Sequence, residues 1–366
     1  MTDVVGLTWD HPRGRNALEA AAPRLGDRSL RWEVQPLEGF ESAPIAELAE
    51  RYDLLVLDHP HLGDAYASRC LRPIDELFDA DQIRSWELAS VGPSLASYRM
   101  AGHLWALPLD AATQVSARLL RLVPQAPAQW ESVADLGDEG LVALSLAGPH
   151  AFLSLCSMVV SFGDDPGRRP DRFFDRSTAE RALGLLSRLA ERLPEGTAAL
   201  NPIGLLDRMR EVGDIGYVPL VYGYVTYAKD VAFGPPPAPG GRVGSTLGGT
   251  GIAVTARCTP SSALLEHLRW LLTPQTQRGF IPGHDGQPSA RAAWLDPAVD
   301  AAAHGFYSAT LDTIEAAWVR PRLPGYIPFQ AAASGAVRAA VLGTRPHGAV
   351  LDEIEDRFAI LREDHP

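Results

Sequence analysis

The sequence contains few cysteines, and they lie far apart. Cys70, Cys156 and Cys258 are the only three among 366 residues, and none forms a Cys-x-x-Cys pair. This spacing predicts neither a disulfide framework nor a structural zinc site. Unpaired cysteines are usually buried, so we expect all three in the interior of the protein.

Positive charge is also scarce. Lys229 is the only lysine, and the formal net charge is −12. Nucleic acids and anionic membrane surfaces attract proteins that carry a concentrated basic surface. No long run of basic residues supplies such a surface, so we predict neither nucleic acid nor a membrane surface as a partner.

Long apolar runs are missing. No stretch approaches the roughly 18 apolar residues of a membrane-spanning helix, so we predict no membrane insertion. The segment Met1–Asp10 lacks the basic start and the apolar run of about 7–15 residues that a secretory signal has. Its short run Val4–Leu7 is typical of a first strand. We therefore expect the protein in the cytoplasm.

Signatures of several enzyme classes are absent as well. The run Gly248–Gly251 lacks the Lys-Ser/Thr pair of a phosphate-binding P-loop, and no His-Glu-x-x-His metal motif occurs. The Gly-x-Ser-x-Gly turn of serine hydrolases is missing too. We predict no cofactor and no bound metal, although histidines from separate loops leave a metal site as an open alternative.

Apolar segments alternate between strand and helix patterns along the first 110 residues. Strand patterns at 4–7, 30–34 and 53–58 are separated by helix patterns at 15–25 and 44–52. This order predicts a mostly parallel, doubly wound α/β sheet. In such sheets, ligands bind at the loops that follow the carboxyl ends of the strands.

A second alternation begins near residue 141. Strands are expected at 141–146, 214–222 and 251–256, and a surface turn or a crossing at the Pro/Gly-rich segment 233–241. Helices are expected at 151–160, 177–193, 261–272, 303–318, 327–342 and 350–362. The residues Ser177 and Glu180 have the spacing of a helix capping box. With 46% hydrophobic residues, a chain of this length can form two lobes.

Six segments occur in the order typical of one protein family. They are Asp53–Asp58 with Leu71–Asp75, Gly102–Pro108, Trp130–Glu131, Ser245–Val254, Thr273–Gln277 with Gly283 and Pro288, and Arg320–Tyr326. In this order the chain resembles the sugar-type (family 1) extracellular solute-binding proteins of ABC transporters. The resemblance implies a two-lobed, periplasmic-binding-protein-like (type II) α/β fold, with hinge-crossing strands and a ligand cleft.

The resemblance also implies how the chain divides between the lobes. Residues 1–110 and 250–305 would form lobe one, and residues 111–245 and 306–366 would form lobe two. The lobes would close over a small-molecule ligand by a hinge motion. A permease partner in the membrane would require export, which the sequence does not predict.

The predicted ligand-binding residues lie in the loops that should converge on this cleft. They are Trp9, Asp10, His11, Arg13, Asp58, His59, Asp110, Thr113, His150, Tyr222, Tyr224, Tyr227, Gly249, His284, Asp285 and Tyr326. Aromatic rings would stack on a sugar ring and arginine would bind a carboxylate, so the ligand is expected to be sugar-like or carboxylate-bearing.

Histidines in these loops leave a second function open. His11, His59, His150 and His284, with Asp58, could carry acid–base chemistry, because histidine exchanges protons near neutral pH. The alternative is therefore a cytoplasmic lyase or dehydratase on the same fold, without a tightly bound metal. A cleft in which two histidines converge on one point would favour the enzyme. A cleft lined by Trp and Tyr would favour binding.

Overall fold

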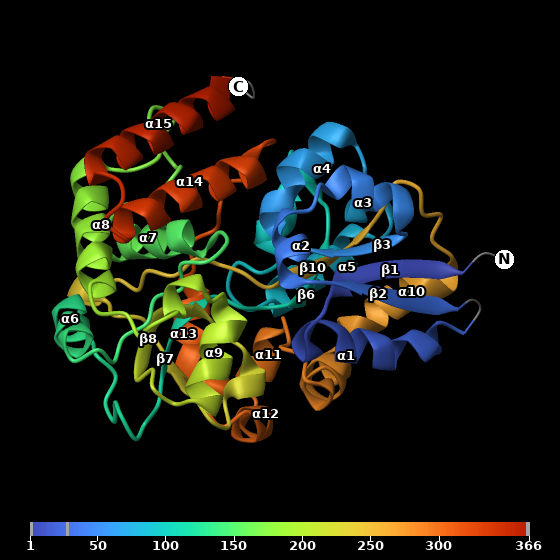
Figure 1. The fold of residues 1–366 in the computed structure, drawn as a ribbon. Coiled ribbons are helices and arrows are strands. Elements are labelled where there is room, and N and C mark those ends of the chain that lie inside the picture. Colours follow the sequence, from blue (N-terminus) through green and yellow to red (C-terminus); the bar gives the residue numbers. More distant parts are fainter. Residues whose placement is uncertain (1–2, 27–28, 364–366) are drawn as a thin grey trace.

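Two sheets organise the two lobes of the protein (Figure 1). The structure is a computed structural model, and it describes residues 3–26 and 29–363. Lobe one contains a five-stranded sheet in the order β2-β1-β3-β10-β6, and lobe two contains a three-stranded sheet in the order β8-β7-β9. The expected two-lobed α/β fold is confirmed.

The sheet of lobe one joins residues from both ends of the sequence. β1 (Val4–Trp9) runs parallel to β2 (Leu30–Gln35) and β3 (Leu54–Leu57). β10 (Thr250–Val254) runs antiparallel to both β3 and β6 (Leu107–Asp110). The sheet is thus mixed, because the chain returns from lobe two in the opposite direction.

Helices surround this sheet, and a small β4–β5 hairpin, Arg99–Met100 with His103–Leu104, lies beside it. The helices are α1 (Pro12–Ala21), α2 (Leu37–Ser42), α3 (Ile45–Arg51), α4 (Leu62–Ser68), α5 (Ala80–Ala89) and α10 (Ser262–Leu271). One continuous apolar core unites the sheet with these helices. The predicted strands and helices of this lobe are all present, with small shifts at their ends.

Lobe two is mainly helical. Its antiparallel sheet pairs β7 (Gln114–Arg118) with β8 (Tyr217–Tyr222) and β9 (Ala232–Gly234). Its helices are α6 (Trp130–Asp138), α7 (His150–Ser161), α8 (Arg176–Ala190), α9 (Pro202–Glu211), α11 (Arg291–Trp294), α12 (Pro297–Ala302), α13 (Phe306–Glu315), α14 (Tyr326–Val341) and α15 (His347–Glu363). Every residue of α7 is buried, and α14 packs against it.

The chain passes between the lobes at residues 110–114, at residues 245–250 and near residue 290. Residues 316–325 join α13 to α14 within lobe two and run beside the first two crossings. Trp318 N–H donates to Ser245 O and Leu247 N–H donates to Trp318 O, both at 2.8 Å. Gln114 N–H donates to Thr246 O at 3.2 Å. These bonds tie the first two crossings and residues 316–325 into one hinge region.

The boundary expected at residue 305 lies too far along the chain. Trp294, Val299 and Ala303 pack into the apolar core built on β7 and β8, which belongs to lobe two. Ser289 is still tied to β6 by a hydrogen bond to Pro108 O at 2.6 Å. Lobe one therefore ends near residue 290, and helices α11 and α12 belong to lobe two.

Three local predictions were wrong. Residues 141–146 are extended and mostly buried, but they form only a single bridge, between Val142 and Tyr217, instead of a strand. The cap of α8 is Asp175, whose carboxylate accepts from Thr178 N–H at 3.1 Å, instead of Ser177. The expected surface turn at 233–241 begins with buried residues of β9, where Phe233 packs into the core.

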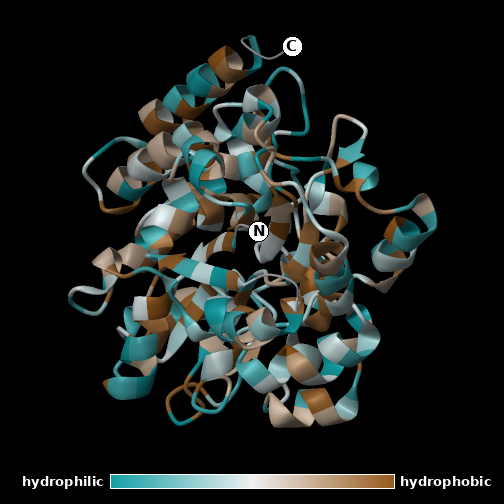
Figure 2. Cartoon of the chain, turned by 90° about the vertical axis from the view of Figure 1, so that its right-hand side faces the viewer, coloured by the Kyte–Doolittle hydropathy of each residue, from teal (hydrophilic) through white to brown (hydrophobic). Residues whose placement is uncertain are grey.

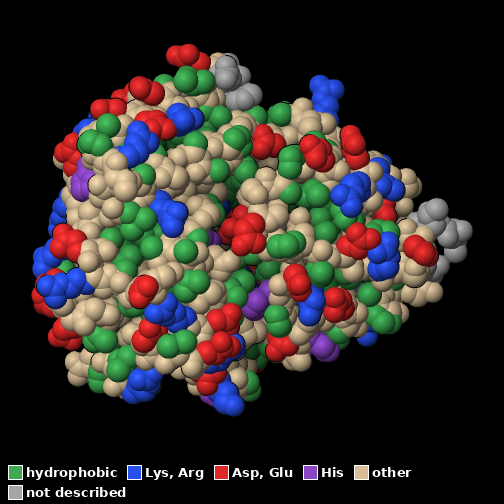
Figure 3. All heavy atoms as spheres, viewed as in Figure 1, with side chains coloured by type: hydrophobic (Ala, Val, Ile, Leu, Met, Phe, Trp, Pro, Cys, Tyr) green, Lys and Arg blue, Asp and Glu red, His purple; other side chains and the backbone are tan. Residues whose placement is uncertain are grey.

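The outer surface agrees with the composition. Helices carry brown apolar and teal polar residues on different faces (Figure 2), as amphipathic helices do. Acidic and basic side chains are interspersed over both lobes in the view of Figure 3. Within the described residues, no helix is both long enough and apolar enough to span a bilayer.

Candidate functional site

A cavity lies between the two lobes, beside the hinge. Lobe one contributes the end of β1, the start of α1, helix α2 and the end of β3, while lobe two contributes the end of β8. The lining residues are Trp9, Arg13, Leu37, Phe40, Glu41, Asp58, Ala112, Tyr222, Tyr224, Gly248, Gly249 and Thr250. This is the place where the carboxyl ends of the parallel strands meet the opposite lobe.

Aromatic rings form much of the wall. Trp9 packs against Phe40 with ring centroids 5.2 Å apart, and the guanidinium of Arg13 lies 4.6 Å from the ring centre of Tyr224. Tyr222 closes the lobe-two side, where a Cβ atom at Gly248 would lie 2.4 Å from its ring. Gly248 must therefore remain glycine for the crossing segment to pass under this ring.

A buried ion pair supports the floor of the cavity. Arg13 donates from Nε to Asp110 Oδ2 at 2.8 Å, and a second bond joins its Nη2 to Asp110 Oδ1. Arg13 Nη1 also donates to Gly223 O of lobe two at 3.1 Å. Burial disfavours the charged guanidinium, but Asp110 more than offsets this and raises the pKa of Arg13. Arg13 therefore links the crossing segment to both lobes.

A second buried pair spans the lobes directly. Arg320, from the segment between α13 and α14, bonds to Asp58 at the end of β3, and only 3% of Arg320 is exposed. Burial would raise the pKa of Asp58, but Arg320 and His59 hold that pKa well below its usual range. Asp58 also accepts from His59 N–H at 2.8 Å, so it caps the short helix that begins there.

Further contacts hold the lobes together near the cavity. His150 Nε2 at the start of α7 lies 3.0 Å from Glu41 Oε1 of α2. Gly325 N–H, next to the start of α14, donates to Asp64 Oδ1 of α4 at 2.6 Å. The lobes are therefore closed on each other.

Closure leaves little room in the cavity. Its volume is about 50 Å³, whereas sites for small organic ligands usually measure about 300–1,000 Å³. A sugar-sized ligand can therefore enter only when the lobes move apart and the pairs that span them separate.

Two polar groups of the wall lack a protein partner. Trp9 Nε1 and Thr250 Oγ1 are buried, and neither finds a hydrogen-bond partner among the described residues. A buried polar group without a partner costs free energy, which a ligand hydroxyl or a water would recover. Both residues line the cavity, so these atoms are suited to bind a polar ligand.

The structure brings six of the sixteen predicted residues to the cavity wall, and each lies at the end of a strand or at a crossing. They are Trp9, Arg13, Asp58, Tyr222, Tyr224 and Gly249. Gly249 has φ 84°, and a Cβ atom there would lie 2.5 Å from Asp110 O. Glycine allows both this backbone conformation and the close approach of two crossing segments.

Four predicted residues lie next to this wall without lining it. Asp110 is the buried partner of Arg13, and His59 is fully buried behind Asp58, beside Tyr98. His11 caps α1 by accepting from Arg13 N–H at 3.1 Å, and its ring contacts Tyr224. His150 stands against Tyr222, paired with Glu41.

Six predicted residues point elsewhere. Asp10 is exposed and pairs with Arg15, while Asp285 accepts from Asn16. The side chain of Thr113 bonds to Ser245 and to Thr246 O within the hinge.

The remaining three of these six predicted residues have ring side chains, and they also lie outside the cavity wall. His284 Nδ1 lies 2.8 Å from Phe280 O, in a short helix that packs against α1. Tyr227 donates to Asp207 at 2.9 Å, and Tyr326 is wholly buried in the core of lobe two.

The histidines do not converge on one point. No histidine lines the cavity, and burial lowers the pKa of both His11 and His59 to about 4. They are neutral near pH 7 and poor proton donors there. Residues 3–26 and 29–363 contain no group of three or more His, Cys, Asp or Glu side chains placed to hold a metal ion.

Sequence reasoning missed the contribution of α2. Leu37, Phe40 and Glu41 line the cavity, and Glu41 carries the contact to His150. They follow β2, a strand of the same parallel set as β1 and β3. The rule that ligands bind after the carboxyl ends of such strands would have found this helix, had it been applied to β2 as well.

Solved structures match this arrangement over nearly the entire chain. An ABC transporter solute-binding protein from Agrobacterium radiobacter K84, in complex with ribitol, aligns with a TM-score of 0.81 at 19% identity, over 98% of both chains. Maltose-bound MalE3 of T. maritima aligns with a TM-score of 0.81 at 17% identity, over 98% of this chain and 99% of that one.

A third match is the GacH receptor of Streptomyces glaucescens, solved unliganded and with acarbose. Its TM-score is 0.80 at 15% identity, over 100% of this chain and 99% of that one. No protein-family model matches the sequence, and no curated protein matches it. The comparisons confirm the expected resemblance as one of fold. The chain has the two-lobed fold of sugar-type solute-binding proteins.

Proposed function

We propose that the protein is a solute-binding protein that closes over a small polyhydroxylated ligand, a sugar or a polyol, in the cavity between its lobes. The observation that carries this proposal is the cavity wall itself. It combines the rings of Trp9, Tyr222 and Tyr224 with two polar atoms that have no hydrogen-bond partner in the described part of the chain. Aromatic faces stack on sugar rings, while scattered polar groups bind hydroxyls.

The charges of the cavity favour a neutral ligand over a carboxylate. Arg13 is already bound to Asp110, and Arg320 to Asp58. A ligand carboxylate would have to displace one of these buried partners, which leaves an unpaired buried charge. Hydroxyl groups can instead donate to Asp58 and Glu41 without breaking either pair.

Known relatives of this fold support the same chemistry. The matching structures were solved with ribitol, with maltose and with acarbose, all of them polyhydroxylated molecules. An acid–base enzyme has less support, because the histidines on which it would depend lie outside the cavity wall. The cytoplasmic location remains a prediction, and fractionation of the source cells tests it.

Binding is tested by calorimetric titration with ribitol, mannitol and maltose. We expect at least one of them to bind, and Tyr224→Ala to weaken that binding at least about tenfold through the loss of a stacking ring. Tyr227→Phe serves as the control, because its hydroxyl bonds to Asp207 outside the cavity. Equal loss in both variants, or none in Tyr224→Ala, would contradict the proposed site.

A further inference from the structure

A second cavity lies in lobe two, against the second crossing and the segment between α13 and α14. Its volume is about 640 Å³, within the range of small-molecule sites. Its wall combines the end of α7, the loop that follows, and two stretches next to the hinge. The lining residues are Val160, 165–168, 241–243 and 316–322. None of them lines the interlobe cavity.

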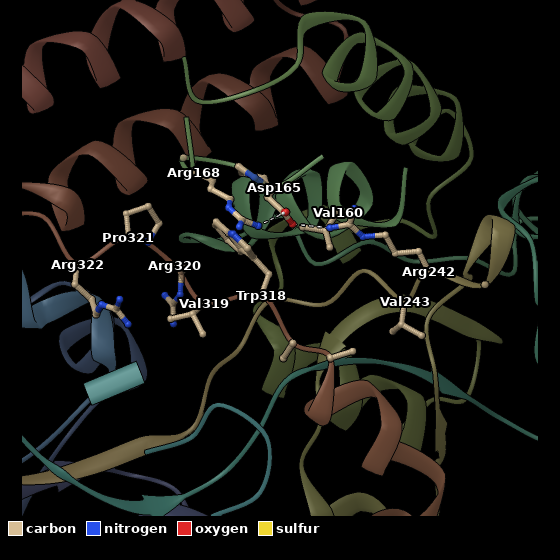
Figure 4. A pocket seen from close by; sticks show the side chains of 15 residues that line it. Val160, Asp165, Arg168, Arg242, Val243, Trp318, Val319, Arg320, Pro321 and Arg322 are labelled. Atoms are coloured by element: carbon tan, nitrogen blue, oxygen red, sulfur yellow. Dashed lines mark hydrogen bonds and ion pairs between the residues drawn. The ribbon is translucent and has the colours of Figure 1, made fainter. Parts of the chain in front are cut away.

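Basic side chains surround this hinge-side cavity (Figure 4). Arg168 Nη1 lies 3.2 Å from Asp165 Oδ2, and Arg242 Nη2 lies 2.5 Å from Asp165 Oδ1. One carboxylate therefore faces two guanidinium groups, which leaves positive charge in excess on this side of the cavity.

Arg322 adds a third cation on the other side. Its Nη1 donates to Ser97 O at 3.2 Å, and it forms no ion pair with any carboxylate of the described residues. Burial lowers the pKa of Arg322, since desolvation disfavours its charge. An anion placed beside it would offset that cost. The fourth arginine of the wall, Arg320, already has Asp58 as its partner.

This concentration of positive charge contrasts with the rest of the chain. The protein carries a net charge of −12, so a general affinity for anions is not expected. Around the cavity, however, Arg168, Arg242 and Arg322 stand against the single carboxylate of Asp165. Guanidinium groups bind phosphate and carboxylate through paired hydrogen bonds.

Apolar groups complete the wall. Trp318 stands between the arginines in Figure 4, and Val160, Val243 and Pro321 are labelled around it. A half-buried indole ring offers a flat surface on which another ring can stack. The wall thus pairs a cationic part with a flat apolar part.

We propose that the hinge-side cavity binds a small organic anion, with its phosphate or carboxylate held by Arg168 and Arg242 and a flat apolar part against Trp318. The site is separate from the interlobe cavity, so a sugar-type ligand and the anion can be bound at the same time.

The test is calorimetric titration of the full chain with AMP, and with adenosine as the neutral counterpart. AMP has a phosphate and a planar ring, and we expect it to bind at least about tenfold more tightly than adenosine. Arg168→Gln and, separately, Arg242→Gln should each weaken AMP binding about tenfold. Arg192→Gln, which removes the same charge from the exposed end of α8, should leave it unchanged.

Three results would overturn the proposal. They are no binding of AMP, equal binding of AMP and adenosine, and wild-type affinity in both cavity variants. Arg168 and Arg242 are both exposed at least in part, so neither variant removes a buried charge, and a second variant keeps the test decisive if one fails to fold. Circular dichroism of each variant, recorded before titration, identifies such a failure.

Discussion

Buried histidines make the stability of this protein sensitive to acid. His267 in α10 is only 4% exposed, and neither ring nitrogen has a partner among the described residues. Burial lowers its pKa from 6.5 to about 4. The unfolded chain therefore takes up a proton below about pH 6.5, whereas the folded protein does so only near pH 4. The contribution of this histidine to stability is complete above pH 6.5 and is lost as the pH falls toward 4.

Replacing this histidine should flatten the acid side of the stability profile. Between pH 7 and pH 5 we expect His267→Leu to lose about 2 kcal/mol less unfolding free energy than the wild type. Urea unfolding at both pH values measures the difference. His103→Gln, at a side chain that is 48% exposed, is the control. Parallel profiles for wild type and His267→Leu would show that the buried ring does not govern the acid response.

The pair of Arg13 and Asp110 should be costly to break. Asp110→Asn leaves the buried guanidinium without its counter-charge, and we expect a loss of about 3–5 kcal/mol of unfolding free energy. Asp10→Asn breaks the exposed pair with Arg15, and it should cost less than about 1 kcal/mol. Denaturant unfolding compares the two variants. Similar losses in both would mean that Arg13 is stabilised mainly by Gly223 O and the ring of Tyr224.

At this scale, the sequence predicted residue types better than residue partners. Trp9, Arg13, Asp58, Tyr222 and Tyr224 reach the cavity because strand ends place them there. Adjacent acid–histidine pairs were less informative, since Asp10 and His11 turn to different neighbours. The chain gives no local signal that Arg320 pairs with Asp58, because that contact joins residues 262 positions apart.

Among the elements, α4 and the segment before α14 form the tightest contact between the lobes. A Cβ atom at Gly63 would lie 2.1 Å from the carbonyl carbon of Leu323 and 2.5 Å from Pro324 N. Backbone atoms cannot yield as a flexible side chain can. Gly63 is therefore required for α4 to meet the start of α14 in the closed form.

Gly63→Ala should oppose closure without touching the cavity wall. We expect the variant to favour the open form and to bind its sugar or polyol at least about tenfold more weakly, because only the closed form makes all contacts. Gly335→Ala, at an exposed position of α14 with open space around it, is the control. It should leave binding unchanged and can raise stability by up to about 1 kcal/mol. Normal affinity in Gly63→Ala would mean that α4 and α14 can separate while the ligand is bound.

Hydrophobic periodicity predicted the ends of helices well wherever the helix was long and amphipathic. Helices α8, α10, α13, α14 and α15 lie close to their predicted positions. Residues 141–146 differed, because an apolar run signals burial without specifying a hydrogen-bonded neighbour. The segment joins the sheet only at its start, where Tyr217 N–H donates to Leu141 O and Ala143 N–H donates to Tyr217 O, both at 3.0 Å.

For the whole molecule, closure depends on a few polar contacts that span the lobes. Arg320 with Asp58 and His150 with Glu41 both lie at the rim of the interlobe cavity. When the lobes open, these groups are exposed to water. Breaking one of the pairs therefore costs less free energy in the open form than in the closed form. The pairs therefore stabilise the closed form selectively.

Arg320→Met should shift the protein toward the open form. A compact chain of 366 residues has a radius of gyration of about 21 Å, and we expect the variant to exceed the wild type in small-angle X-ray scattering. Added ligand should reduce the difference by favouring closure. Identical scattering of both proteins, with and without ligand, would show that this pair does not control the hinge.

The two-lobed architecture was predictable from the order of weak motifs along the chain, whereas the volume of the cavity was not. Six segments in order imply the fold, since the order of strands and helices specifies topology. The cavity of about 50 Å³ depends on how side chains from both lobes meet. The predicted position of the boundary between the lobes differs from the structure for a similar reason. Helices α11 and α12 follow lobe one in sequence but pack on lobe two.

The position of β10 between β3 and β6 has a consequence for synthesis on the ribosome. β6 ends at Asp110 and β10 begins at Thr250, so 140 further residues must be added before the last strand of the first sheet begins to form. At about 5–20 residues per second this takes about 7–28 s. During that interval β3 and β6 expose unpaired edges, which invite aggregation between nascent chains. Because β10 is synthesised late, correct folding of the first lobe depends on how fast the chain elongates and on whether a chaperone covers the open sheet edges.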